Sequence, residues 1–198
     1  MGQESDPIEE TLDPEDWDAM RVLGHQMIDD LLEYVKDLKN RPAWQHAPEA
    51  VKEHFDAGPP LDPQTPESIY QEYQEYILPY PMGVNHPRFW GWVAGCGTVM
   101  GAYAELLAAG TNSPSGAFSY ISPNYVEHQV LNWFKDMLGY PAQASGLLTS
   151  GCSASNLIGL AVARNTKAGY DLRKEGLQTA PHKMVLYASS EAHSSLQK

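Results

Sequence analysis

The stretch Leu148-Thr-Ser-Gly-Cys-Ser-Ala-Ser-Asn156 decides the fold of this chain. Its small residues join a short extended segment, 146–149, to a helix lined by Leu157 and Leu160. Such a junction exposes hydroxyls and the first-turn backbone amides of the helix, which have no intrahelical acceptor. The stretch therefore predicts a strand–turn–helix unit. It can bind a phosphate group at the positive end of the helix, or it is an ordinary serine cap.

The residues around this turn alternate between extended and helical patterns. Residues 184–188, Met-Val-Leu-Tyr-Ala, read as a buried strand, and helices are expected over 98–109 and from Ser122-Pro123 to Gly139. Residues 89–163 carry only four formally charged side chains, so this part is expected to be buried. The alternation predicts an α/β fold with a layer of parallel strands.

The first part of the chain is expected to be helical. Asp13 suits an N-cap and Pro14 a first helical position, and apolar residues then recur every three or four positions, so a helix is expected over 14–39. Residues 41–66 are rich in proline and predict a connector with a short helix near 48–56. Thr65-Pro66 predicts the start of a further helix. We expect a helical arm over 1–85 and an incomplete α/β domain over 86–198.

Composition excludes several classes of protein. The chain has 198 residues and a formal net charge of −12, and residues 1–18 hold eight acidic side chains and no basic one. No basic stripe is available for a nucleic-acid backbone, and no apolar run is long enough for a membrane span. The N-terminal residues lack a signal-peptide pattern. The two cysteines, Cys96 and Cys152, are too few for a disulfide framework or a zinc cluster, so a cytoplasmic protein without a metal site is expected.

Two further features could carry chemistry. His193 follows the expected strand 184–188, and strand ends are where α/β proteins place ligand-contacting residues. The segment Asn85-His-Pro-Arg-Phe-Trp-Gly-Trp92 is either a core strand or an aromatic wall for a flat substrate. A serine hydrolase with Ser153 as nucleophile is a weaker interpretation, because Ser155 stands where the Gly-x-Ser-x-Gly elbow needs its last glycine.

Four blocks of the chain resemble the pyridoxal-phosphate-dependent (group II) amino-acid decarboxylases of the aromatic-L-amino-acid decarboxylase family. The blocks follow the family's order and cover nearly the whole chain, more weakly before residue 65. They are His86-Pro87-x-Phe89-x-Gly91, Ser122-Pro123-x3-Glu127, Ser150-Gly151-x-Ser153-Ala154-Ser155-Asn156-Leu157, and Ala192-His193-Ser194-Ser195. The resemblance implies the fold-type I architecture of pyridoxal-phosphate enzymes, here as an N-terminal helical arm plus the first part of the large α/β domain.

The resemblance also implies roles for individual residues. His193 looks like the histidine that stacks on the cofactor ring and donates a proton after CO2 loss. The cofactor phosphate would be held by Ser153, Ala154 and Ser155. Trp92, Val93 and Gly95 fall where the family lines its substrate pocket, and many relatives carry tyrosine at the place of Trp92. Phe118 matches a residue that reaches into the partner subunit's site, which implies a homodimer clasped by the helix over 14–39.

Two residues that the family's chemistry needs have no counterpart in this sequence. In such enzymes a lysine holds the cofactor as a Schiff base and an aspartate keeps the ring nitrogen protonated, and both come well after the histidine. Only five residues follow His193, and neither Lys183 nor Lys198 occupies a matching position. The chain is therefore expected to be the N-terminal part of a larger enzyme.

The function expected from this resemblance is decarboxylation of an L-amino acid to its amine and CO2. An aromatic substrate is favoured, because the pocket segment is aromatic. An aldehyde-forming variant of the reaction stays open. The alternative is a non-catalytic, truncated homologue that binds or regulates a full-length decarboxylase.

Overall fold

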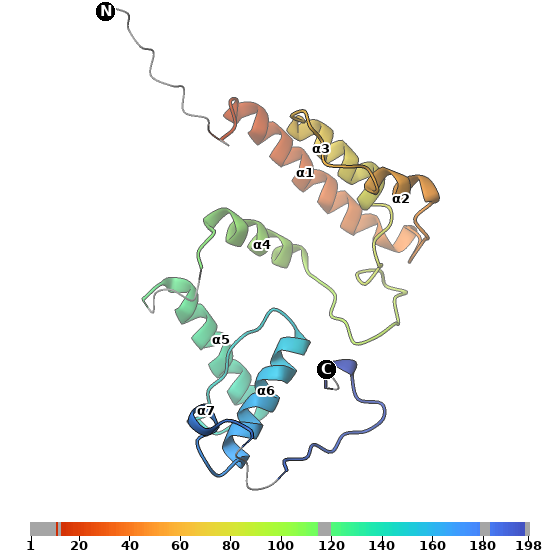
Figure 1. Cartoon of the computed structure of the whole chain (residues 1–198). Helices are drawn as coiled ribbons and strands as arrows, with labels where there is room; N and C mark the ends of the chain where they lie inside the picture. Colours follow the sequence, from red (N-terminus) through yellow and green to blue (C-terminus); the bar gives the residue numbers. More distant parts are fainter. Residues whose placement is uncertain (1–10, 12, 115–119, 179–182, 197–198) are drawn as a thin grey trace, which may run out of the picture. The chain divides into compact units, whose positions relative to one another are not determined.

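The computed structural model describes residues 11, 13–114, 120–178 and 183–196 (Figure 1). The chain divides into two compact units, Met1–Asn112 and Ser113–Lys198. We call them the first and the second unit and describe each by itself. The expected division into an arm over 1–85 and an α/β domain over 86–198 stays a prediction.

The first unit begins with the long helix α1, Trp17–Asp37, followed by the 3-10 turn η1, Leu38–Asn40. The predicted helix is present, but it begins later than expected. The Asp16 carboxylate, not that of Asp13, accepts the backbone amides of Asp18 and Ala19 at the helix start. An N-cap side chain must lie within reach of the second or third amide of the helix, and Asp16 meets that condition.

Two shorter helices follow, α2 (Glu49–Phe55) and α3 (Pro66–Glu72), and α3 continues into a π-helical turn, η2 (Tyr73–Ile77). The predicted start at Thr65-Pro66 is confirmed, since the Thr65 hydroxyl accepts the Ser68 amide at 3.2 Å. Figure 1 shows α1 and α3 side by side. The Tyr70 hydroxyl donates to the Asp30 carboxylate at 2.8 Å, and Gln74 donates to the same oxygen at 3.0 Å. These bonds join α3 and η2 to α1.

The Tyr70 bond predicts a loss of stability at alkaline pH. Burial and the hydrogen bond to Asp30 raise the pKa of Tyr70 to about 12. The folded state therefore holds the phenolic proton more tightly than the unfolded state, whose tyrosine has a pKa of about 10. This contribution is complete below pH 10 and is lost as pH rises from about 10 to about 12. Urea unfolding at a series of pH values measures it.

Two substitutions, Tyr70→Phe and the control Tyr103→Phe, separate this contribution from general alkaline unfolding. Tyr70→Phe should be about 1 kcal/mol less stable than the native chain at pH 8, because one hydrogen bond is lost. It should lose less stability than the native chain between pH 10 and pH 12. Tyr103→Phe, on α4 (Val99–Thr111), should keep the native pH profile. Parallel profiles for the native chain and Tyr70→Phe would contradict the assignment.

The last helix of the first unit, α4, begins and ends at recognisable caps. The Thr98 hydroxyl accepts the Gly101 amide at 3.0 Å, as the expected helix over 98–109 requires. The helix continues past Gly110 and ends at Asn112, whose φ of 39° lies in the left-handed region. Asparagine tolerates this conformation better than most residues, so it ends the helix in place of the expected glycine.

The second unit contains α5 (Ser122–Leu138), α6 (Cys152–Lys167), the single turn α7 (Leu172–Glu175) and the 3-10 turn η3 (Ser194–Leu196). The expected bounds of α5 are confirmed. Pro123 stands in its first turn, and Gly139, with a φ of 69°, ends it. The helix expected after Gly151 is α6, and η3 packs against it.

The expected strands do not form within the described residues. Residues 146–149 and 184–188 have no regular secondary structure and form no strand ladder. A strand is defined by its hydrogen bonds to a neighbour, and neither segment has one here. The α/β layer is therefore not observed among the described residues, although the expected order around residue 151 is kept as irregular segment, turn and helix.

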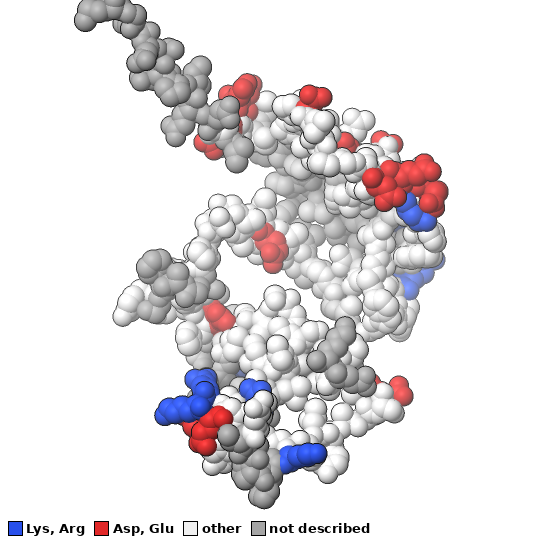
Figure 2. Space-filling model, viewed as in Figure 1, with Lys and Arg blue, Asp and Glu red and all other residues white. Residues whose placement is uncertain are grey.

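The expected burial of residues 89–163 is also wrong. The buried side chains of the described residues are Leu23, Val51, Tyr70 and His86, all in the first unit and all before residue 89. Figure 2 shows α4 with an almost entirely white, uncharged surface. Apolar composition indicates which side chains can be buried, but burial itself needs a covering element. Of the described helices, none combines the length and apolar character that a membrane crossing requires.

Candidate active site

The turn before α6 carries backbone amides without acceptors. The amides of Ala154 and Ser155 donate to the Gly151 carbonyl at 3.1 and 3.2 Å and so begin the helix. The amides of Cys152 and Ser153 have no acceptor among the described residues, as expected for the first positions of a helix. The turn therefore presents two free donors where the helix dipole favours an anion.

The hydroxyls of the turn are in different states. The Thr149 hydroxyl donates to the Gly151 carbonyl at 3.0 Å and lies 2.6 Å from the Ser155 hydroxyl. Ser155 therefore already has a partner within the protein. Ser153 is exposed and its hydroxyl has no hydrogen bond among the described residues. Of the two serines among the predicted phosphate-binding residues Ser153, Ala154 and Ser155, Ser153 has the hydroxyl that is available without breaking an existing bond.

Two side chains of α5 hold the extended segment that leads to this turn. The Glu127 carboxylate accepts the Leu148 amide at 2.8 Å. The Lys135 ammonium donates to the carbonyls of Ala142 and Ala144 at 2.9 and 3.1 Å. Glu127 belongs to one of the four blocks quoted above, but its contact with the turn segment was not foreseen. Lys135 was not singled out, and no local sequence signal marks it.

His193 lies in the short turn before η3, and hydrogen bonds through Ser195 link its ring to α6. Its Nδ1 atom accepts the Ser195 amide at 3.2 Å and lies 2.9 Å from the Ser195 hydroxyl. That hydroxyl accepts a bond from the side-chain amide of Asn156, on α6, at 2.9 Å. The structure thus brings His193 to the helix that begins at the candidate phosphate turn. No hydrogen bond joins His193 to Ser153 in the described part of the chain.

The three residues of the predicted substrate wall lie in the first unit. Trp92, Val93 and Gly95 are in the irregular segment before α4, and Trp92 is 85% exposed. Its φ of 58° is unusual for a bulky side chain and marks a strained backbone. The two ends of this segment are joined, because the Asn85 side chain accepts the Gly97 amide at 3.0 Å. Phe118 lies outside the described residues.

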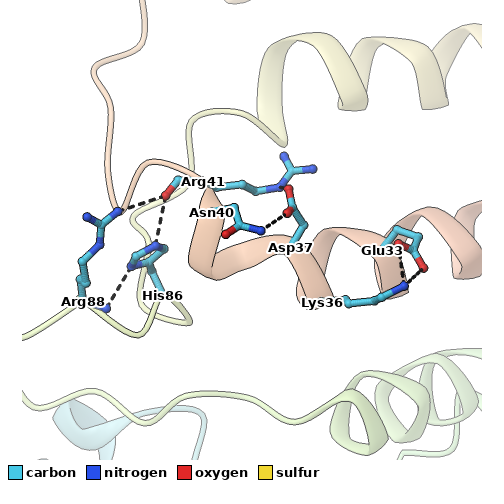
Figure 3. Close-up of polar contacts among 7 residues, drawn as sticks. All are labelled: Glu33, Lys36, Asp37, Asn40, Arg41, His86 and Arg88. Carbon is cyan, nitrogen blue, oxygen red and sulfur yellow. Dashed lines mark hydrogen bonds and ion pairs between the residues drawn. The ribbon is translucent and has the colours of Figure 1, made fainter.

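His86 anchors the beginning of this aromatic segment to the end of the arm helix (Figure 3). Its Nε2 atom donates to the Arg41 carbonyl at 3.1 Å, and its Nδ1 atom accepts the Arg88 amide at 3.0 Å. With 4% of its surface exposed, it is the buried histidine of the described residues. The backbone amide of His86 donates to the Gly83 carbonyl. Position 83 requires glycine, because a Cβ atom there would collide with the Ala43 carbonyl.

Arg41 connects this anchor to α1. Its guanidinium lies 4.7 Å from the centre of the Tyr34 ring, and its Nε atom lies 3.5 Å from the Asp37 carboxylate. Asn40 donates to that carboxylate at 2.8 Å (Figure 3). His86, in the His86-Pro87 block, thus links the aromatic segment to the end of α1 through Arg41. The sequence did not predict this link.

Comparison with known proteins decides the family. A family model described as the pyridoxal-dependent decarboxylase conserved domain matches residues 48–198. The chain belongs to this family. Rice tryptophan decarboxylase 2 is 32% identical over 96% of this chain and 39% of its own length. The aromatic-L-amino-acid decarboxylase of Bacillus atrophaeus is 28% identical over 91% of this chain and 36% of its own length. The chain spans less than two-fifths of the length of these two relatives.

Solved structures place this decarboxylase-family chain in a known fold. The crystal structure of Rhodiola rosea 4-hydroxyphenylacetaldehyde synthase matches 93% of the chain with a TM-score of 0.74 and 24% identity, over 40% of that protein. Catharanthus roseus tryptophan decarboxylase matches 84% of it with a TM-score of 0.68 and 21% identity, over 37% of that protein. These likenesses support the fold-type I architecture at the level of the chain path.

The family's cofactor is pyridoxal phosphate, and the α6 turn of this chain fits its phosphate group. Within the described part of the chain, the amides of Cys152 and Ser153 and the Ser153 hydroxyl form a set of free donors to which no carboxylate is bonded. Phosphate oxygens accept hydrogen bonds and carry charge, so such a set is chemically suited to them.

Proposed function

We propose that this chain provides the phosphate turn, the ring-facing histidine and part of the substrate wall of a pyridoxal-phosphate-dependent decarboxylase. An aromatic L-amino acid is the proposed substrate. The observation that carries the proposal is the α6 turn, with two free amides and a free Ser153 hydroxyl, in a chain of this family. Relatives named as tryptophan, tyrosine and aromatic-L-amino-acid decarboxylases support the aromatic substrate.

Each residue has a defined task in this proposal. The turn Ser153, Ala154 and Ser155 would hold the cofactor phosphate, with the free amides of Cys152 and Ser153 and the Ser153 hydroxyl as the available donors. His193 would lie against the cofactor ring and provide a proton from Nε2 to the substrate carbon. Trp92, Val93 and Gly95 contact the aromatic side chain of the substrate. Pyridoxal phosphate, when bound, supplies the electron sink that accepts the electron pair left by departing CO2.

A chimera tests the activity. Residues 1–198 replace the matching segment of rice tryptophan decarboxylase 2, which provides the rest of the enzyme. We expect the cofactor-loaded chimera to release CO2 from at least one of L-tryptophan, L-tyrosine and L-DOPA. Amine and aldehyde are quantified separately, because the relatives include a phenylacetaldehyde synthase. A chimera that binds pyridoxal phosphate but releases no CO2 would contradict the proposal.

The phosphate turn is tested by comparing pyridoxal phosphate with pyridoxal. Ser153→Ala should weaken binding of pyridoxal phosphate to the chimera about tenfold, the loss expected for one hydrogen bond to a charged group. Ser155→Ala should have a smaller effect, because its hydroxyl already bonds to Thr149. Binding is measured by fluorescence titration of the cofactor-free protein. Equal losses for pyridoxal, which lacks the phosphate, would show that Ser153 does not contact that group.

We also propose a homodimer in which Phe118 reaches the partner's site, and a cytoplasmic location. Sedimentation of the active chimera at several concentrations tests the dimer. A chimera that is monomeric at every concentration would contradict it. The regulatory alternative makes a different prediction: the 198-residue chain would bind a full-length relative while the chimera stays inactive.

A further inference from the structure

The hydrogen bonds around His193 determine which ring nitrogen carries the proton. A backbone amide can only donate, so Nδ1 must accept the bond from the Ser195 amide at 3.2 Å. Nδ1 is then unprotonated, and the proton of the neutral imidazole sits on Nε2. Nε2 has no hydrogen-bond partner among the described residues, so this proton is free to be donated.

Asn156 determines the direction of the neighbouring bond. Its side-chain nitrogen donates to the Ser195 hydroxyl oxygen at 2.9 Å. Because Nδ1 of His193 is unprotonated, the Ser195 hydroxyl must be the donor in its 2.9 Å contact with that nitrogen. Asn156, Ser195 and His193 therefore form one chain of donors that ends on Nδ1, and we call it the His193 relay.

We propose that Asn156 is a positioning residue that acts through Ser195 to hold His193 with its proton on Nε2. This inference rests on the proposed function, in which Nε2 donates the proton. Asn156 touches neither the cofactor nor the substrate in this scheme. It connects α6, whose first turn is the candidate phosphate site, to the proton donor, so one helix would set the position of both.

The substitution Asn156→Asp gives the sharpest test, because it keeps the shape and reverses the bond. An aspartate accepts the Ser195 proton and withdraws it from Nδ1. Ser195→Ala removes the hydroxyl, whereas Ser195→Thr keeps it. Ser194→Ala is the matched control, since Ser194 is adjacent and takes part in none of the hydrogen bonds of the relay. Circular dichroism confirms that each variant keeps the native helix content.

The tautomer is measured in the 198-residue chain with ¹⁵N-labelled histidine at pH 8, where imidazole is ordinarily neutral. Long-range ¹H–¹⁵N spectra distinguish protonated from unprotonated ring nitrogens. His193→Gln identifies the signal. Asn156→Asp and Ser195→Ala should each lower the ratio of the Nε2–H to the Nδ1–H form about fivefold, the factor expected for one lost hydrogen bond. Ser195→Thr and Ser194→Ala should leave the ratio unchanged.

Activity of the chimera provides the second measurement. Asn156→Asp should lower kcat with KM unchanged, by no more than the fall of about fivefold in the tautomer ratio, and Ser195→Thr should retain the native kcat. An unchanged tautomer ratio in both Asn156→Asp and Ser195→Ala would overturn the relay, whatever the activity. The tautomer measurement uses no cofactor, so an inactive native chimera would count against the proposed function and leave the relay standing.

Discussion

Replacing His86 by alanine is expected to lower the free energy of unfolding of the first unit by about 3 kcal/mol. The imidazole is buried and makes two hydrogen bonds, to the Arg41 carbonyl and from the Arg88 amide. Its removal leaves both backbone groups without a partner and opens a cavity between the end of α1 and the aromatic segment. Urea unfolding, followed by circular dichroism and tryptophan fluorescence, measures the change.

His25 provides the matched control for this prediction. It is exposed on α1, so His25→Ala should change the stability by no more than about 0.5 kcal/mol. His86→Gln, which has both a donor and an acceptor, should recover part of the loss. Proteolysis within residues 89–97 should also become faster in His86→Ala. A His86→Ala chain as stable as His25→Ala would show that the anchor does not hold the first unit together.

Replacing His193 by alanine should lower kcat of the chimera by about a hundredfold or more. A positioned proton donor contributes about 10² to 10⁴ in rate. The bonds at Nδ1 of His193 leave its Nε2 proton free to be donated within the described part of the chain. KM should change less than kcat, because the lost interaction belongs to proton transfer. Steady-state CO2 release with the best aromatic substrate measures both constants.

His128→Ala is the control for this substitution, since His128 is exposed on α5 in the same unit. It should retain the native kcat and the native cofactor content. Cofactor content must also be measured for His193→Ala, so that loss of chemistry is separated from loss of binding. A His193→Ala chimera that keeps its cofactor and at least half of its kcat would remove His193 from the proposed proton transfer.

Local features of the fold were predictable because they depend on neighbouring residues. Helices begin at the predicted N-caps Thr65 and Thr98, whose hydroxyls accept backbone amides, and α5 ends at the predicted Gly139. The start of α1 was misplaced because Asp13 and Asp16 are both plausible caps, and only the chain's path selects Asp16. Competing local signals of similar strength cannot be ranked from sequence.

Features that depend on distant partners were predicted poorly. Residues 184–188 have the composition of a buried strand, yet Tyr187 is 90% exposed and the segment has no ladder. The contacts of His86 with Arg41 and of Asn156 with Ser195 join residues 45 and 39 positions apart. No spacing rule marks such pairs in a single sequence.

The sequence by itself determined the family blocks, the helix caps and the small-residue turn at Gly151, since these are properties of adjacent residues. The tertiary structure alone decided that Ser153 is free while Ser155 is bonded, and that His193 accepts at Nδ1. The physical reason is that a hydrogen bond needs its donor and acceptor within about 3 Å and aligned, and the path of the folded chain decides which groups, near or far in sequence, meet that condition. The phosphate turn was therefore visible in the sequence, but its available donors and the proton position of its histidine were not.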